Sequence, residues 1–125
     1  WLDSENIPIQ LRHMDALVLP SRTQSNWKEQ FGRVLLEAMA TGVPVIGSNC
    51  GEIPNVIGDA GLVFTEGDQT ALTAALLKLT TNPALRQELA ERGRTRMLTK
   101  YTQTQVAAET VRVYRNLTRD GMTPR

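Results

Sequence analysis

The segment of residues 15–46 constrains the fold of this chain more than any other. It begins with a short apolar run, residues 15–20, that ends in proline and suits a buried parallel strand. After a polar loop, apolar residues recur at the spacing of an amphipathic helix, at positions 31, 34, 35, 38 and 39. Gly42 is placed to end that helix, and Pro44, which has no N–H for a ladder, stands where a strand at Val45–Ile46 begins. A strand, a helix and a strand in succession predict a βαβ unit with a parallel sheet.

The rest of the chain is predicted to add one strand, at residues 62–64, and several helices. Asp68 and the Asn82–Pro83 pair are typical N-terminal caps for two of these helices, and Gly93 is expected to loosen the second. The predicted helical segments are a short one near residues 7–14, one turn at 53–57, and longer helices at 70–79, from 83 onward and at 104–117. The predicted fold class is therefore α/β, a Rossmann-like parallel sheet with flanking helices.

Size and composition exclude several classes of protein. The chain has 125 residues and 41% hydrophobic content, which suits one domain with an apolar core. A formal net charge of +1 gives no strong attraction to nucleic acid. The single cysteine, Cys50, rules out an internal disulfide framework and fits a reducing compartment. Because the sequence also shows no signal-peptide pattern and no apolar run of roughly 20 residues, we expect a cytoplasmic protein.

The charge is unevenly distributed along the chain. Ten of the 14 Lys and Arg residues, but only four of the 13 Asp and Glu residues, lie from Lys78 onward. We interpret this basic part as a solvated helical face, and contact with anionic lipid headgroups at the inner face of a membrane is the alternative. Its members include Arg86, Arg92, Arg94, Arg96, Lys100, Arg112, Arg115 and Arg119.

Two glutamates in the central segment are the leading candidates for function. Glu29 precedes the predicted helix and Glu37 lies two turns inside it, about 12 Å away at a rise of about 1.5 Å per residue. That separation is on the scale of a nucleotide sugar rather than of a water between paired catalytic carboxylates. Gly32 lets an anion approach the N–H groups of the helix start, and a carboxylate at Glu37 can accept from both hydroxyls of a ribose. The alternative is that Glu29 is only a charge favoured by the helix dipole and that Glu37 is a solvated partner of Arg33.

The complete motif from Glu29 to Ile46 is more specific for a function than either glutamate alone. Glu29-x-Phe-Gly-x4-Glu37-Ala-Met-Ala-x-Gly-x-Pro-Val-Ile resembles the E-x7-E signature of retaining glycosyltransferases of family 4, which have the GT-B fold. The resemblance extends to residues 15–21 before the signature and to the glycine-rich loop of residues 50–61 after it. It implies that residues 1–125 are part of a C-terminal nucleotide-sugar-binding domain, with a Rossmann-like core at about 1–80 and C-terminal helices at about 83–118.

The resemblance also implies a role for each residue of the motif. Glu29 faces the donor sugar or the reacting centre and is the catalytic candidate, while Glu37 holds the nucleotide ribose. The other residues implied in donor binding are Phe31, Gly32, Arg33, Ser21, Arg22 and Gly51. The family needs no metal or other cofactor. The sequence departs from the family at Asn55, where glutamate is frequent, and it does not include the Arg and Lys that usually neutralise the diphosphate.

The partners implied are a nucleoside diphosphate sugar as donor and a saccharide or lipid-linked acceptor. The sequence starts at Trp1 rather than Met, so we expect a piece of a longer protein whose N-terminal, acceptor-binding domain is missing here. Alone, such a piece is not expected to catalyse transfer. Two alternatives stay open: a GT-B epimerase or glycogen-type synthase, and a non-catalytic Rossmann-like scaffold domain. Trp27 either stacks on a base or sugar or anchors its loop.

Overall fold

A computed structural model describes residues 6–120 of the chain, with side chains described up to residue 117. At its centre is a sheet of three parallel strands in the order β1-β2-β3, in which Leu17 pairs with Val45 and Val45 with Gly61. The strands are β1 (Leu17–Leu19), β2 (Val45–Ser48) and β3 (Gly61–Phe64). All three lie where the sequence predicts them, and the α/β fold class is confirmed.

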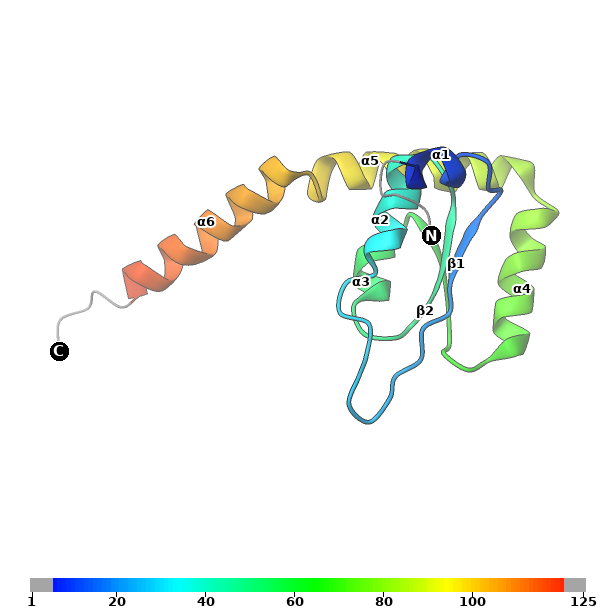
Figure 1. Cartoon of the computed structure of the whole chain (residues 1–125), viewed down its shortest axis with the longest axis horizontal. Coiled ribbons are helices and arrows are strands. Elements are labelled where there is room, and N and C mark those ends of the chain that lie inside the picture. Colours follow the sequence, from blue (N-terminus) through cyan, green and yellow to red (C-terminus); the bar gives the residue numbers. More distant parts are fainter. Residues whose placement is uncertain (1–5, 121–125) are drawn as a thin grey trace.

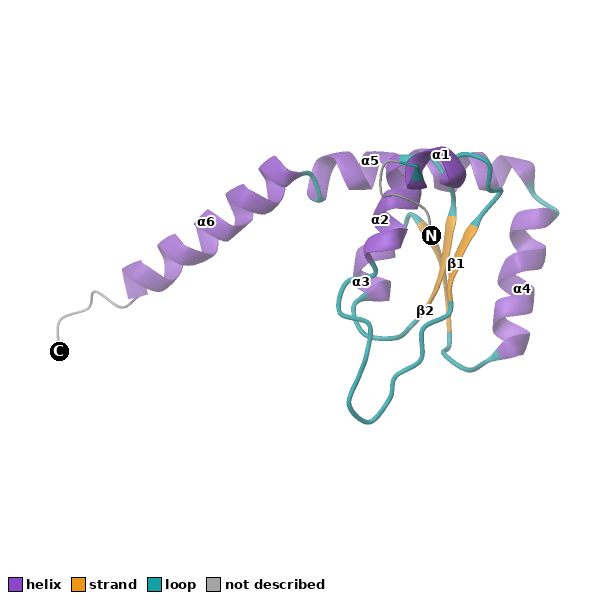
Figure 2. Cartoon of the chain, in the orientation of Figure 1, coloured by secondary structure: helices purple, strands orange, loops and turns teal. Residues whose placement is uncertain are grey.

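With the exception of the last one, the helices within residues 6–120 lie on both faces of the sheet and at one end of it (Figures 1 and 2). They are α1 (Ile7–Leu11), α2 (Arg33–Ala40), α3 (Ile53–Ile57), α4 (Gln69–Thr80), α5 (Pro83–Lys100) and α6 (Gln103–Asp120). Figure 1 shows α2 and α3 on one face, α4 on the other, and α5 crossing the end where the strands begin. Loops occupy the opposite end of the sheet, where the strands end.

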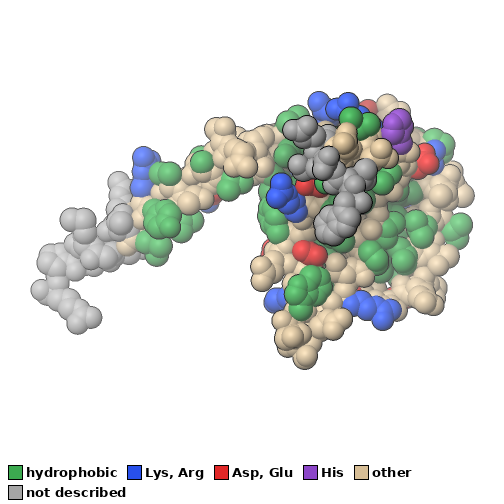
Figure 3. Space-filling view, in the orientation of Figure 1, with side chains coloured by type: hydrophobic (Ala, Val, Ile, Leu, Met, Phe, Trp, Pro, Cys, Tyr) green, Lys and Arg blue, Asp and Glu red, His purple; other side chains and the backbone are tan. Residues whose placement is uncertain are grey.

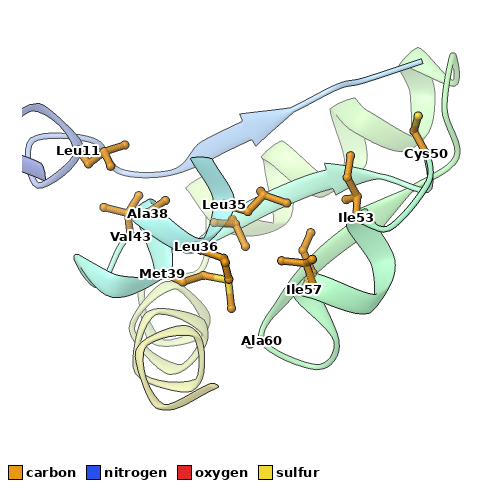
Figure 4. Packing of buried hydrophobic residues seen from close by; sticks show 12 residues of the cluster. Leu11, Leu35, Leu36, Ala38, Met39, Val43, Cys50, Ile53, Ile57 and Ala60 are labelled. Atoms are coloured by element: carbon orange, nitrogen blue, oxygen red, sulfur yellow. The ribbon is translucent and has the colours of Figure 1, made fainter. Parts of the chain in front are cut away.

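The core has one apolar cluster on each face of the sheet because alternate strand residues point in opposite directions. Val45 of β2 packs in the cluster with α2 and α3, whereas Ile46 packs with Leu79 of α4. In Figure 4, Leu35 of α2 lies close to Ile57 of α3. The central strand is fully buried, and it therefore fixes the positions of the helices on both sides.

Local signals in the sequence set several helix ends. The side chain of Asp68 accepts a hydrogen bond from the Ala71 N–H at 2.9 Å, and that of Asn82 accepts from the Leu85 N–H at 3.0 Å. Both predicted N-caps are thus confirmed. Gly42 follows α2 with a φ of 77°, the left-handed conformation that closes a helix.

The start of α2 differs from the prediction. The helix begins at Arg33 rather than at Phe31, because Gly32 takes a left-handed φ of 68° and serves as the N-cap. Phe31 therefore lies outside the helix and is 44% exposed. Glu37 is about one turn from the start of the helix, not two, so its separation from Glu29 is not a helical rise over eight residues.

The expectation that Gly93 loosens its helix is wrong. Helix α5 runs without interruption through Gly93, which is buried against α2. A Cβ added at this position would lie 3.2 Å from Cγ of Met39. The missing side chain therefore allows α5 and α2 to pack closely, and this contact compensates for the low helix propensity of glycine.

The interpretation of the basic C-terminal helices as a solvated face is wrong for Arg86 and Arg96 of α5, which are partly buried. Arg92, Arg94 and Lys100 are exposed as expected. Within the described part of the chain, four arginines of α5 donate hydrogen bonds to backbone carbonyls of other segments. Arg96, whose side chain is 16% exposed, binds the carbonyls of Val56 at 2.8 Å and Asn55 at 2.7 Å. The other three are Arg86, Arg92 and Arg94, which bind the carbonyls of Leu79, Asp59 and Ala40 respectively. These cations tie α5 to the sheet domain.

Helix α6 projects away from the rest of the molecule (Figure 1) and carries exposed apolar side chains along its length (Figure 3). Among residues 6–120, no helix combines the length and the apolar character that crossing a membrane requires.

Candidate functional site

The loops that follow the three strands meet at the carboxyl edge of the sheet. Ser48, at the end of β2, donates its hydroxyl hydrogen to the carbonyl of Ser21 at 2.6 Å. The Thr23 N–H donates to the carboxylate of Glu66, beyond β3, at 2.7 Å, and the Thr23 hydroxyl lies 3.5 Å from Sγ of Cys50. Open parallel α/β sheets bind ligands at this edge. The predicted convergence of the loops after β1 and β2 is thus present in the structure.

Glu29 occupies the start of α2. Its Oε1 accepts a hydrogen bond from the Gly32 N–H at 3.0 Å, and its Oε2 accepts from the Ser21 hydroxyl at 3.3 Å. A carboxylate in this position is stabilised by the helix dipole. The anion that approaches the Gly32 N–H in this structure is therefore the protein's own Glu29 carboxylate, and this N–H is not open to a ligand.

The backbone of Glu29 is held against the loop that follows β2. Its carbonyl accepts from the Glu52 N–H at 3.1 Å, and its N–H points to Sγ of Cys50 at 3.5 Å. Gly51 makes this approach possible, because a Cβ at this position would lie 1.9 Å from the Glu29 carbonyl oxygen. Gly51 also has a φ of 56°, which favours glycine.

Glu66 is a residue of this edge that the sequence reasoning missed. Besides binding Thr23, it donates its own N–H to the side-chain oxygen of Asn49 at 2.8 Å. The hydrogen bond from the Thr23 N–H lowers the pKa of Glu66. One signal was available: Glu66 comes directly after the predicted third strand, so it had to lie at the same edge as the loop after β1.

A groove beside α2 holds the second glutamate. Glu37 lies 3.3 Å from Nε of Arg33, and the two side chains are 32% and 87% exposed respectively. Such an exposed i, i+4 pair contributes only about 0.3–0.5 kcal/mol, so it does not keep Glu37 from binding another group. Phe31 and Tyr101 also line the groove, which has a volume of about 650 Å³. Their rings meet edge to face with centroids 6.0 Å apart.

The predicted residues thus fall into two neighbouring sets. Ser21, Glu29 and Gly51 belong to the carboxyl edge, whereas Phe31, Arg33 and Glu37 line the groove, and Gly32 joins the two at the start of α2. Arg22 is exposed at the edge, with its guanidinium beside Gly67 in the loop after β3. Tyr101 was not predicted to lie near these residues, because it is far from the motif in the sequence and no local pattern connects the two.

Two further residues can be placed. Trp27 is 50% exposed, and its backbone pairs with that of Gln24 within the loop. Asn55 donates its side-chain N–H to the carboxylate of Glu52 at 2.9 Å. Among the described residues, no three His, Cys, Asp or Glu side chains gather in a group of metal-binding type.

The sequence comparison with protein families identifies the family to which this chain belongs. The family described as "Glycosyl transferases group 1" matches residues 1–96. This chain belongs to that family. The resemblance to glycosyltransferases found in the central motif is therefore confirmed at the level of the group 1 family.

Group 1 relatives are much longer than this chain. N-acetyl-alpha-D-glucosaminyl L-malate synthase from Bacillus anthracis is 34% identical over 118 residues, which cover 93% of this chain and 30% of that protein. Sucrose-phosphate synthase from Thermosynechococcus elongatus superposes with a TM-score of 0.79 at 29% identity, over 95% of this chain and 29% of that one. The chain thus spans less than a third of the length of these two relatives.

A third relative is a solved C-terminal domain. It comes from a glycosyl transferase group 1 family protein of Francisella tularensis and superposes with a TM-score of 0.71 at 31% identity. The match covers 82% of this chain and 51% of that one. Together with the synthase structure, it confirms the fold as that of a group 1 glycosyl transferase domain.

Proposed function

We propose that this chain is the donor-binding part of a retaining glycosyltransferase of family 4. The enzyme moves a sugar from a nucleoside diphosphate sugar to an acceptor hydroxyl. The observation that carries the proposal is the position of Glu29, which lies at the carboxyl edge of the sheet and at the start of α2, next to the groove that holds Glu37. The similarity to a solved C-terminal domain supports the assignment of these residues to the C-terminal half of the enzyme.

The start of α2 is the proposed site of the donor diphosphate. The first N–H groups of a helix have no partner within it, and the helix dipole favours an anion there. Glu29 takes the Gly32 N–H in this structure. We propose that the diphosphate binds the N–H groups of the first turn and that Glu29 then turns toward the donor sugar. The exposed guanidinium of Arg33, the first residue of α2, supplies positive charge at this position, and that of Arg22 lies at the same edge of the sheet, beside Gly67.

Glu37 is the proposed ligand of the nucleotide ribose. Its two carboxylate oxygens can accept from both hydroxyls of the sugar, and its exposed partner Arg33 is free to follow the phosphate. Phe31 and Tyr101 form an apolar wall in the same groove. A groove of about 650 Å³ is within the size range of small-molecule sites.

The proposed chemistry relies on positioning and electrostatics. Transfer develops negative charge on the departing diphosphate, and helix N–H groups and arginines aimed at that charge lower the barrier. Glu29 faces the donor sugar and holds it in place while the acceptor oxygen attacks on the same face. No resident metal and no other cofactor takes part in this proposal.

The remaining parts of the proposal concern the rest of the enzyme. The acceptor is a saccharide or a lipid-linked saccharide, and most of its contacts belong to an N-terminal domain outside residues 1–125. The enzyme works in the cytoplasm, at the inner face of the membrane when its acceptor is lipid-linked. Transfer requires both halves, because the acceptor and the donor must meet between them.

The test is steady-state kinetics of the full-length protein with UDP- and GDP-sugars. Glu37→Ala is expected to raise the donor KM roughly 10- to 100-fold, since a hydrogen bond to a charged group contributes about 1.5–3 kcal/mol. Glu29→Gln is expected to lower kcat with a smaller change in donor KM. The matched control is Glu91→Gln, an exposed glutamate of α5 that lies outside the proposed site.

Four outcomes contradict the proposal or one of its parts. If Glu29→Gln and Glu37→Ala both leave the kinetics at the wild-type level, the site assignment fails. If calorimetry of the wild-type protein with UDP and GDP shows no binding, the scaffold alternative is favoured. NMR of the product distinguishes retention from inversion at the anomeric carbon, and loss of activity in EDTA contradicts metal-independent catalysis.

A further inference from the structure

We propose that the loop between β1 and α2 carries a subsite for a sugar ring of the acceptor. The inference rests on the proposed glycosyltransferase function and deepens it. Figure 1 shows this loop extending beyond the carboxyl edge of the sheet, farther than the loops after β2 and β3. It encloses a pocket of about 420 Å³, lined by Thr23, Gln24, Ser25, Asn26, Trp27, Lys28 and Gln30.

The loop has a defined shape. Near its tip, Gln24 and Trp27 exchange backbone hydrogen bonds of 2.7 and 3.3 Å. At one end of the pocket the Thr23 N–H is held by Glu66, and at the other the Glu29 carbonyl is held by the Glu52 N–H. A pocket formed in this way is preorganised, so a ligand does not have to order the loop when it binds.

The chemistry of the pocket fits a saccharide. Trp27 is 50% exposed, and an indole ring offers a flat apolar face to the C–H groups of a pyranose while its N–H remains a donor. Gln24, Asn26 and Gln30 are exposed, and their amide groups are both donors and acceptors, as sugar hydroxyls require. In Figure 3 the lowest part of the molecule is mostly tan, the colour of the backbone and of side chains that are neither hydrophobic nor charged.

The position of the pocket assigns it to the acceptor rather than to the donor. Lys28 and Gln30, which line it, stand on either side of Glu29 in the chain. The proposed donor groove lies on the other side of Glu29, along α2, where it is lined by Phe31, Arg33 and Glu37. The pocket therefore adjoins the backbone at Glu29, whose carboxylate lies outside it on Ser21 and Gly32. We place a sugar bound here on the acceptor side of that carboxylate, opposite the donor groove.

The same loop could be considered for insertion into a membrane interface, where Trp and Lys are common. The lining favours the saccharide, because Trp27 is the single large apolar side chain in it and the remaining groups are amides, hydroxyls and one ammonium. Insertion would bury those amides without partners, which is unfavourable.

The experiment is saturation-transfer NMR on the full-length protein with its donor site filled by UDP or GDP. The probes are methyl α-D-glucoside, methyl α-D-mannoside and methyl β-N-acetyl-D-glucosaminide. We expect saturation transfer to the ring C–H protons of at least one probe. We expect Trp27→Phe to retain this signal, Trp27→Ala to weaken binding about tenfold, and Asn26→Ala to weaken it several-fold.

The control is Leu77→Ala, which removes an exposed apolar side chain from α4 and should leave the signal unchanged. Calorimetric titration with UDP and GDP is run on the same variants and should not change. Absence of saturation transfer to all three probes overturns the subsite. A signal in Trp27→Ala that equals the wild-type signal overturns it as well. The subsite is also overturned if the protein binds phosphatidylglycerol vesicles in a Trp27-dependent way while none of the sugar probes shows saturation transfer. A wild-type protein that binds neither nucleotide contradicts the proposed function instead.

Discussion

The carboxyl edge of the sheet and the core between α2, α3 and α5 are held together by different forces. At the edge, side chains bind backbone groups of neighbouring loops: Ser48 to Ser21, Glu66 to Thr23 and Glu29 to Gly32. In the core, buried aliphatic side chains such as Leu35 and Ile57 fill the space between helices. This difference indicates that burial of apolar side chains in the core provides most of the stability, whereas hydrogen bonds at the edge position Glu29.

The largest effect on stability is expected from Leu35→Ala, in the core. Leu35 is fully buried, and truncating such a leucine removes about 3–5 kcal/mol from the free energy of unfolding. Urea unfolding of the chain measures the change. Leu77→Ala, at a position that is 57% exposed, is the matched control and is expected to stay within about 0.5 kcal/mol of wild type. Equal losses in the two variants would contradict the assignment of stability to this core.

Gly51→Ala is expected to have the next largest effect, and it acts at the edge. The new Cβ meets the Glu29 carbonyl oxygen, and the left-handed φ adds strain, so we expect a loss of about 3 kcal/mol. The displaced Glu29 should also lower kcat of the full-length protein. Gly42→Ala is the control, since its φ of 77° is similar but the space around it is open. It should cost only about 1 kcal/mol and leave kcat unchanged. A wild-type kcat in Gly51→Ala would contradict the inference that this glycine positions Glu29.

Arg96→Met tests whether the arginines of α5 belong to the core side of the comparison. Arg96 binds the carbonyls of Asn55 and Val56, so its loss should destabilise the chain by about 2 kcal/mol. Lys78→Met, an exposed cation of α4, should be close to neutral. Hydrogen exchange of the α3 amides provides a local readout. No increase in exchange would show that the hydrogen bonds from Arg96 do not hold α3 in place.

The smallest effect is expected from Glu66→Gln, and it depends on pH. The hydrogen bond from Thr23 lowers the pKa of Glu66 in the folded chain, so its ionised form stabilises the fold at a pH above the ordinary value of about 4.3. This contribution is lost as the pH falls through the lowered pKa. The urea midpoint of Glu66→Gln should therefore be slightly below wild type at neutral pH, and the two midpoints should converge once the pH falls below the lowered pKa of Glu66. A difference between the two urea midpoints that grows as the pH falls would contradict the predicted sign of this pH dependence.

Much of the fold was predictable from local patterns. The strand that ends at Pro20, the strand after Pro44 and the caps at Asp68 and Asn82 were all found from the sequence, because each depends on short-range chemistry. The start of α2 was not, since the apolar spacing continues through Phe31 and hides the left-handed turn at Gly32. The role of Gly93 was missed for a different reason: it depends on Met39 of another helix.

For the candidate site, the sequence by itself determined the motif of Glu29, Gly32 and Glu37, and with it the family. Only the tertiary structure decided that Glu29 binds the Gly32 N–H and that Gly51 leaves room for the Glu29 backbone. It also decided that Glu66 lies at the carboxyl edge and that Tyr101 lines the groove. The physical reason is distance along the chain. Helix periodicity, caps and motifs act between residues a few positions apart, whereas these contacts join segments that meet only when the parallel sheet forms.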